Sequence, residues 1–246
     1  MQTENIKSED ESKNKIGELD DKKDIKAKTI TFDEIDNFEQ DGSFLISGKR
    51  RSGKSVLILN LLHLLTNKYQ YDFIVLISDT AKDNKKCVFK ELIDKSMIFT
   101  SEQMDDKINK VLKYQDANIK KDKDIYGIII LDDINLTKIS QGSLQKCFSL
   151  GRHKNLCIIL SCQYPKKVVD NVIRSNSDVI LCSKLNMAGI DSIFECINCP
   201  ISRTKFYKFV NKNTKNHHFI MYNSFDEDDD IKIIKGEMIK LVKKKK

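Results

Sequence analysis

Runs of consecutive apolar residues punctuate this sequence and alternate with stretches of helical periodicity. Five runs predict buried strands, at 44–46, 71–78, 125–131, 156–161 and 179–182, and two further runs, 97–100 and 218–222, predict a short strand and a last or edge strand. Helices are expected at 56–65, 90–94, 101–114, 143–150, 166–174 and 187–196. Because strands that alternate with helices form βαβ units, the sequence predicts an α/β fold with a mainly parallel sheet flanked by helices.

The two ends of the chain lack this pattern. Residues 1–28 mix acids and lysines with almost no large apolar side chains, so burial cannot repay the entropy of ordering them, and a disordered tail is expected. At the other end, an acidic run at 226–230 is followed by a lysine-rich segment at 231–246, and both are typical of solvated, mobile segments. One folded domain is therefore predicted at 29–225.

Composition narrows the class of protein. The chain has 246 residues, 40% of them hydrophobic, which is enough for one well-buried core. No apolar run reaches the roughly 18 residues that span a bilayer, and the polar N-terminus does not fit a signal peptide, so we expect a soluble, intracellular protein. Seven cysteines, several of them inside apolar runs, fit buried thiols better than disulfides. The net charge of +7 comes from lysine and does not by itself identify a polyanionic partner.

A phosphate-binding loop is the clearest motif. It follows the apolar run 44–46, precedes an apolar helix and matches G-x-x-x-x-G-K-[ST] at each fixed position. Its residues are Gly48, Lys49, Arg50, Arg51, Ser52, Gly53, Lys54 and Ser55. The two glycines let successive backbone N–H groups point at phosphate oxygens. Lys54 is expected to reach the β- and γ-phosphates and Ser55 to ligate Mg²⁺, so ATP and Mg²⁺ are the predicted ligands. Residues 30–39, just upstream, are expected to form either a short strand and turn or a lid over the adenine.

Two adjacent carboxylates follow the most apolar strand. Asp132 and Asp133 come directly after 125–131, where the carboxyl end of a central parallel strand meets its ligand. Asp132 is predicted to hold Mg²⁺ and Asp133 to orient or deprotonate the attacking water. Many ATPases carry Glu at the second position, and Asp is one methylene shorter. A capping or loop role is the alternative for this pair.

Further polar residues are candidates for the same site. Gln163 follows the next strand, where its amide is expected to contact the γ-phosphate or the water, or else to make an ordinary loop hydrogen bond. Phosphoryl transfer also gains from a guanidinium supplied by a neighbouring subunit, and Arg152 and Arg174 are the candidates. Arg50 and Arg51 would instead contact phosphates or a neighbouring subunit, and a plain surface role is open for each arginine.

Other chemistries find little support. The chain has four histidines and no G-x-S-x-G, which argues against a hydrolase triad. Cys196 and Cys199 form a single C-x-x-C with no second ligand pair at zinc spacing, so packing on a helix face is the expectation for Cys196. The guanine-reading N-K-x-D of GTPases is absent. A nucleotide kinase would share the phosphate loop but should add an arginine-bearing lid and an acceptor pocket, neither of which is evident.

In this order and spacing, FLISGKRRSGKS, IIILDDIN, GRHKNLCIILSCQYP and NVIRSNSDVIL resemble the genome-packaging ATPases of large DNA viruses and virophages, which belong to the FtsK–HerA superfamily. The resemblance covers residues 40–225. It implies a P-loop core with an additional strand, assembled as a homo-oligomeric ring that uses ATP hydrolysis to drive double-stranded DNA into a preformed capsid. It further implies that Gln163 acts as a sensor and that Arg152, or second Arg174, reaches into the next subunit's site.

The resemblance also implies partners and a place of action. These are double-stranded DNA without sequence preference, capsid or portal-vertex proteins, and the host cytoplasm at the virus factory, with association to the virion. Lys166 and Lys167, or Arg203, Lys205 and Lys208, are expected on basic loops near the pore of the ring, or else on plain solvated surface. A kinase, another cellular-type DNA translocase and a non-hydrolysing scaffold remain the alternatives.

Overall fold

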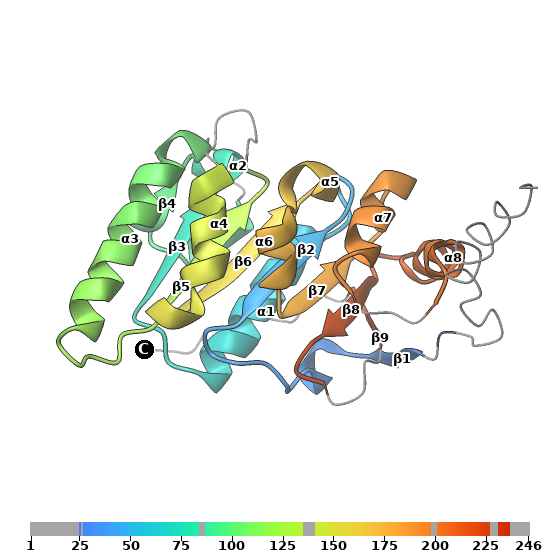
Figure 1. Ribbon diagram of the computed structural model, residues 1–246, viewed down its shortest axis with the longest axis horizontal. Coiled ribbons are helices and arrows are strands. Elements are labelled where there is room, and N and C mark those ends of the chain that lie inside the picture. Colours follow the sequence, from blue (N-terminus) through green and yellow to red (C-terminus); the bar gives the residue numbers. More distant parts are fainter. Residues whose placement is uncertain are drawn as a thin grey trace, which may run out of the picture.

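One mixed sheet forms the centre of the molecule in the computed structural model (Figure 1). The structure describes residue 25 and residues 27–83, 87–134, 141–197, 201–226 and 231–236. Its strands are β1 (Ala27–Ile30), β2 (Ser43–Ser47), β3 (Phe73–Ile77), β4 (Ile98–Phe99), β5 (Gly127–Asp132), β6 (Leu156–Cys162), β7 (Val179–Cys182), β8 (Phe219–Asn223) and β9 (Ile231–Ile234). Within the described residues they follow the order β1-β9-β8-β7-β2-β6-β5-β3-β4. All neighbouring pairs are parallel except those that β8 makes with β7 and β9.

Helices cover both faces of the sheet. They are α1 (Lys54–Lys68), α2 (Asp79–Asp83), α3 (Met104–Ile119), α4 (Gln141–Leu150), α5 (Pro165–Val168), α6 (Asn171–Ser175), α7 (Met187–Phe194) and α8 (Arg203–Asn213), with short 3-10 turns that include η1 (Phe32–Glu34), η2 (Val88–Glu91), η4 (Ser101–Gln103) and η5 (Arg152–Lys154). In Figure 1, α3, α4 and α6 lie in front of the sheet and α1 lies behind it. The predicted α/β fold with a mainly parallel, helix-flanked sheet is confirmed.

The central strands are apolar throughout because each face of the sheet packs on helices. In β5, Ile129 and Leu131 belong to the core shared with α3, α4, α6 and α7, whereas Ile128 and Ile130 belong to the core shared with α1. A strand buried on both faces needs apolar residues at successive positions rather than at alternate ones. The consecutive aliphatic residues that predicted this strand therefore reflect its place in the middle of the sheet.

One strand separates the phosphate-loop strand from the strand that carries the two aspartates. β6 pairs with β2 on one side and with β5 on the other. It is the additional strand that the family resemblance implied. Since β2, β5 and β6 are parallel, the residues that follow them meet at one edge of the sheet, which is where ligands bind in folds of this class.

Several elements differ from expectation. The sheet extends past residue 225, because β9 places Ile231, Ile233 and Ile234 in the core between charged flanks. The strand predicted at 218–222 is an interior strand, since β9 pairs with it. The helix predicted at 166–174 is two short helices, and Asp170 caps the second by accepting a hydrogen bond from Ile173 N.

The basic residues expected on loops lie on helices instead. Lys166 and Lys167 belong to α5. Arg203, Lys205 and Lys208 belong to α8, a helix that the sequence pattern did not predict and that buries Phe206 and Val210. Of the two predicted tails, residues 1–24, 26, 227–230 and 237–246 lie outside the described residues.

Buried thiols appear where the apolar runs predicted them. Cys147, Cys157, Cys162 and Cys182 are buried and free. Burial raises the pKa of Cys147, Cys162 and Cys182 to about 12 in each case, which keeps these thiols protonated and unreactive. None of the helices in the described ranges is both long enough and apolar enough to cross a membrane.

Candidate nucleotide site

The phosphate loop joins the carboxyl end of β2 to the start of α1. Gly53 has a φ of 98°, a left-handed conformation that glycine adopts without strain, and it is the N-cap of α1. A glycine N-cap offers no side chain to the first N–H groups of the helix, so these groups and the positive end of the helix dipole remain for an anion. Gly48 is required for packing, since a Cβ there would lie 2.5 Å from Ser52 Oγ. The loop thus has the backbone shape that phosphate binding needs.

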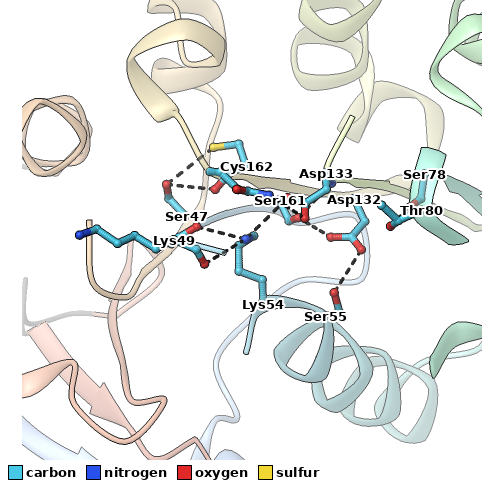
Figure 2. Close-up of polar contacts among 12 residues, drawn as sticks. Ser47, Lys49, Lys54, Ser55, Ser78, Thr80, Asp132, Asp133, Ser161 and Cys162 are labelled. Carbon is cyan, nitrogen blue, oxygen red and sulfur yellow. Dashed lines mark hydrogen bonds and ion pairs between the residues drawn. The ribbon is translucent and has the colours of Figure 1, made fainter. Parts of the chain in front are cut away.

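Lys54 points from the first turn of α1 back over this loop. Its side chain is 5% exposed, and Nζ donates hydrogen bonds to the carbonyl oxygens of Gly48 (3.1 Å) and Lys49 (3.5 Å). The same Nζ lies 3.6 Å from Asp133 Oδ1. Figure 2 shows Lys54 directed into the cluster of acidic and hydroxyl side chains, whereas the Lys49 side chain points away from it. The ammonium group is therefore held at the junction of the phosphate loop and β5.

Asp132 and Ser55 form the oxygen pair that fits Mg²⁺. Ser55 Oγ lies 3.3 Å from Asp132 Oδ2, and Ser161 Oγ donates to the other carboxylate oxygen of Asp132 (Figure 2). Burial raises the pKa of Asp132, an effect that the neighbouring Asp133 carboxylate reinforces and that the Ser161 hydrogen bond and the Lys54 ammonium oppose. A buried carboxylate next to a hydroxyl suits a hard cation, which is usually held by one or two protein groups together with substrate phosphates.

Asp133 lies between the lysine and the predicted sensor. Gln163 Nε2 donates to Asp133 Oδ2 over 3.0 Å, and Asp133 N donates to Ser161 Oγ over 3.4 Å. Asp133 has a φ of 48°, in the left-handed region that non-glycine residues seldom adopt. Its buried Oδ1 has no hydrogen-bond partner among the described residues and faces Lys54 at ion-pair distance. An unusual backbone and a carboxylate oxygen without a hydrogen bond are typical of functional residues.

Ser161 is the site residue that sequence reasoning missed. It is fully buried and lies beside Asp132 in the register of β5 and β6. The only signal in the sequence was a polar residue near the end of an apolar strand, and its partner depends on strand register. Ser78, directly after β3, and Thr80, in α2, also lie near Asp132, with their hydroxyl oxygens 3.2 Å apart (Figure 2).

The two candidate finger arginines lie away from this cluster. Arg152, just before β6, pairs with Asp178, just before β7, at 2.7 Å, and Asp178 in turn accepts hydrogen bonds from Ser43 at the start of β2. These residues mark the amino ends of their strands, the edge opposite to the phosphate loop. Arg174 ends α6 and pairs with Glu195 at 3.0 Å. Arg152 therefore lies far from the nucleotide site of its own chain, so a catalytic role for it would require a neighbouring subunit.

Cys196, the described member of the single C-x-x-C pair, lies just after the end of α7. Among the residues that the structure describes, no three or more His, Cys, Asp or Glu side chains are grouped to hold a metal ion. Cys196 is half-buried and its thiol donates to Ser192 O, in agreement with packing on a helix, whereas Cys199 lies outside the described residues.

Comparison with known proteins agrees with this geometry. The family model described as "Poxvirus A32 protein" matches residues 30–246, which is most of the chain. This chain belongs to the Poxvirus A32 protein family. No curated protein sequence matches it at a significant level. The Poxvirus A32 match covers the phosphate loop, the two aspartates and Gln163, and it extends through β9.

Solved structures share the fold of this Poxvirus A32 family member. The genome packaging NTPase B204 from Sulfolobus turreted icosahedral virus 2 in complex with ATP-gammaS matches with a TM-score of 0.54 and 18% identity, over 80% of this chain and 97% of that chain. B204, the DNA-packaging ATPase from Sulfolobus turreted icosahedral virus, matches with a TM-score of 0.52 and 19% identity, over 78% and 96%. The pCW3 conjugation coupling protein TcpA matches with a TM-score of 0.50 and 14% identity, over 80% and 60%. The family resemblance inferred from the sequence is confirmed.

Proposed function

We propose that this Poxvirus A32 family member is an ATP-hydrolysing motor that moves double-stranded viral DNA into a preformed capsid. The observation that carries the proposal is the convergence of Lys54, Ser55, Asp132, Asp133 and Gln163 at the carboxyl edge of the sheet, within one network of hydrogen bonds and ion pairs. The likeness to virus genome packaging NTPases over nearly their whole length supports the choice of this function among P-loop proteins.

Each residue of the network has a distinct task in hydrolysis. The loop N–H groups and Lys54 bind and orient the phosphates, and Lys54 offsets the negative charge that spreads over the γ-phosphoryl oxygens. Ser55 and Asp132 would hold Mg²⁺, which neutralises phosphate charge when it is bound. Asp133 orients the attacking water and accepts its proton.

Gln163 links the nucleotide site to an exposed segment of the chain that follows it. It contacts Asp133, and Tyr164, Lys166 and Lys167 follow within four residues. Tyr164 is 61% exposed, both lysines are exposed, and Lys167 Nζ lies 5.9 Å from the centre of the Tyr164 ring. Exposed cations bind DNA phosphates without reading sequence. Loss of the γ-phosphate would therefore change the position of a DNA-contacting segment through Gln163.

A ring of identical subunits completes the proposal. Arg152 is 59% exposed at the edge opposite to the nucleotide, and its guanidinium, paired with Asp178 in the single chain, would be offered to the site of a neighbouring chain. A guanidinium supplied in this way typically adds about 10³ to 10⁵ in rate. The partners are then double-stranded DNA, copies of this chain and the capsid vertex, and the place of action is the host cytoplasm.

ATPase activity with and without double-stranded DNA tests the function. A translocase should be stimulated by DNA, and the stimulation should weaken with salt, with a log–log slope of about −0.9 per phosphate contacted. The double variant Lys166→Ala/Lys167→Ala should lose stimulation but keep basal hydrolysis. A rate of ATP hydrolysis that is the same with and without DNA would indicate a kinase. Nucleotide binding without any hydrolysis would indicate a scaffold.

A further inference from the structure

A groove of about 490 Å³ lies between α8 and the outermost strands of the sheet, β1 and β9. Its lining combines apolar and basic side chains, which include Ile25, Ala27, Phe209 and Ile233 together with Lys205, Lys208 and Lys212. We propose that residues 1–24 of this chain bind in this groove as an acidic segment, and that they cover the lysines of α8. The inference concerns a surface outside the nucleotide site and does not depend on ATP hydrolysis.

The lysines of the groove lie on one face of α8. Lys208 follows Lys205 by three positions and Lys212 follows Lys208 by four, so their side chains are neighbours on the helix surface. Lys208 and Lys212 are exposed, and none of the described residues that line the groove is acidic. Like charges at this spacing repel one another, and an acidic group placed beside them relieves the repulsion. The basic side of the groove therefore favours an anionic occupant.

The apolar side of the groove distinguishes a peptide from a nucleic acid. Ile25 and Phe209 are half-buried, so each keeps surface that an occupant can cover. DNA phosphates would pair with the lysines and leave this apolar surface in contact with water. A peptide that carries both acidic and aliphatic side chains covers both kinds of surface, and removing apolar surface from water is favourable. An acidic peptide with some aliphatic residues is therefore the occupant that fits.

Residues 1–24 have this composition, and they end at the groove. The segment contains an acidic run at 9–11 and further acids beside two aliphatic residues, Ile16 and Leu19. It has too few apolar side chains to form a core by itself, and the groove supplies the apolar surface that it lacks. Residue 24 directly precedes Ile25, which itself lines the groove. Attachment at this point gives an effective concentration on the order of millimolar, so that even weak binding keeps the groove occupied.

The segment precedes the part of the chain that the family model matches, residues 30–246. Docking of this segment is therefore proposed from the charge and the position of residues in this chain, and it is not a property taken from the family. Covered in this way, Lys208 and Lys212 would not be available to other polyanions.

Carbodiimide coupling of the full-length protein, followed by mass spectrometry, tests the proposal, because it joins a carboxylate to a lysine amine only where the two are in contact. The reporters are the acids at 9–11 and Glu18. They should couple to Lys208 and Lys212 several-fold more often than to Lys113, which is exposed on α3 at the opposite end of the sheet (Figure 1). An extended segment of this length reaches about 80 Å and the nine-stranded sheet spans roughly 40 Å, so distance alone does not exclude Lys113.

Substitutions within the segment test complementarity while the residues of the groove stay unchanged. Asp10→Asn/Glu11→Gln should lower the coupling of Glu18 to the lysines of α8 several-fold, because two of the attracting charges are lost. Lys13→Gln/Lys15→Gln is the matched control. It removes two charges of the opposite sign from the same segment and should not lower the coupling.

The aliphatic residues of the segment are tested separately. Ile16→Ser/Leu19→Ser keeps every charge and should lower the coupling of Glu18 to α8, because the apolar side of the groove loses its partner. If Lys113 couples as often as Lys208 and Lys212, or if neither the acidic nor the aliphatic variant lowers the coupling, the segment does not bind in the groove and the inference is wrong.

Two further outcomes would give the groove another occupant and overturn the proposal. In a mixture of isotope-labelled and unlabelled protein, cross-links within one chain support the proposal, whereas cross-links found only between labelled and unlabelled chains would place the segment on a second copy. If coupling is absent and Lys208 and Lys212 become protected from acetylation only when duplex DNA is added, the groove binds DNA.

Discussion

Gln163 donates a hydrogen bond to the carboxylate of Asp133 over 3.0 Å, which joins the residue predicted to sense the γ-phosphate to the residue predicted to activate water. Lys54 approaches the other oxygen of the same carboxylate at 3.6 Å. Lys54, the proposed proton acceptor Asp133 and the proposed sensor Gln163 therefore share one contact network. A substitution at one of these residues is expected to change the position of the other two side chains.

Asp133→Asn should separate binding from turnover. The amide keeps the shape of the side chain but cannot accept a proton, so ATP affinity should stay near wild type while kcat falls by about 10² to 10⁴. Nucleotide titration and steady-state hydrolysis measure the two effects. Gln163→Ala should lower kcat by itself, and in the double variant the two losses should not add, because both act on one proton acceptor. Normal turnover in Asp133→Asn would refute its role as the base.

Lys54→Ala should lose ATP binding. The ammonium group is buried and would make charge-assisted hydrogen bonds to phosphate, so affinity should fall by at least about tenfold. Lys49→Ala is the matched comparison, since Lys49 is exposed and its side chain points away from the site (Figure 2). Equal losses in the two variants would mean that general positive charge, rather than the position of Lys54, binds the nucleotide.

Asp132→Asn should stabilise the nucleotide-free protein while it abolishes Mg²⁺-dependent hydrolysis. Burial raises the pKa of Asp132 above its ordinary value of 3.8, so the folded chain keeps this proton to a higher pH than the unfolded chain does. This carboxyl therefore lowers the free energy of unfolding as pH rises from the unfolded pKa through the folded pKa, and the cost persists at neutral pH.

Thermal unfolding against pH checks this expectation. The melting temperature of Asp132→Asn should exceed that of wild type at pH 7, by roughly 2–4 °C for each kcal/mol regained, and the difference should shrink as the pH is lowered through that window. A lower melting temperature for the variant at pH 7 would show that the hydrogen bonds of Asp132 outweigh the cost of burying its charge.

Ser161→Ala should lower the affinity for Mg²⁺ without changing the affinity for ATP. Ser161 positions Asp132 by donating to its carboxylate, and loss of such a supporting hydrogen bond typically costs about 10- to 100-fold in metal affinity. The Mg²⁺ concentration for half-maximal hydrolysis should rise accordingly, whereas ATP binding measured without Mg²⁺ should not change. Ser149→Ala, at an exposed position on α4, is the control. An unaltered Mg²⁺ dependence in Ser161→Ala would contradict the positioning role.

Arg152 can be tested as a residue that acts on a neighbouring subunit. Arg152 is 59% exposed, and its partner Asp178, which is 14% exposed, keeps its hydrogen bonds from Ser43, so Arg152→Ala should cost little stability, about 1 kcal/mol. Hydrolysis by Arg152→Ala alone should be severely reduced, and mixing it with Lys54→Ala subunits should restore part of the activity, because each chain supplies what the other lacks. If Arg152→Ala alone hydrolyses normally, Arg174 becomes the candidate.

The sequence predicted those parts of the site whose residues are adjacent in the chain, and it missed those that depend on strand pairing. The phosphate loop and the Asp132-Asp133 pair were evident because their chemistry is fixed by adjacent residues and by the apolar strands before them. Ser161 was missed because its importance depends on which residue faces it across two strands. β9 was assigned to a tail because its short apolar stretch is flanked by charges, and it is stable only through pairing with β1 and β8. The proposed arginine finger would act on a neighbouring subunit, and the contacts within one chain therefore give no reason to choose Arg152 over Arg174.

Displacement of a third strand from linear double-stranded DNA tests the central claim most directly, because it reports movement along the duplex rather than hydrolysis alone. With ATP and Mg²⁺, the wild-type protein should release a bound triplex-forming oligonucleotide, and Asp133→Asn, which is expected to bind ATP without hydrolysing it, should leave the oligonucleotide in place. Release that needs no hydrolysis, or hydrolysis by the wild-type protein without any release, would contradict the account of this chain as a DNA-translocating motor.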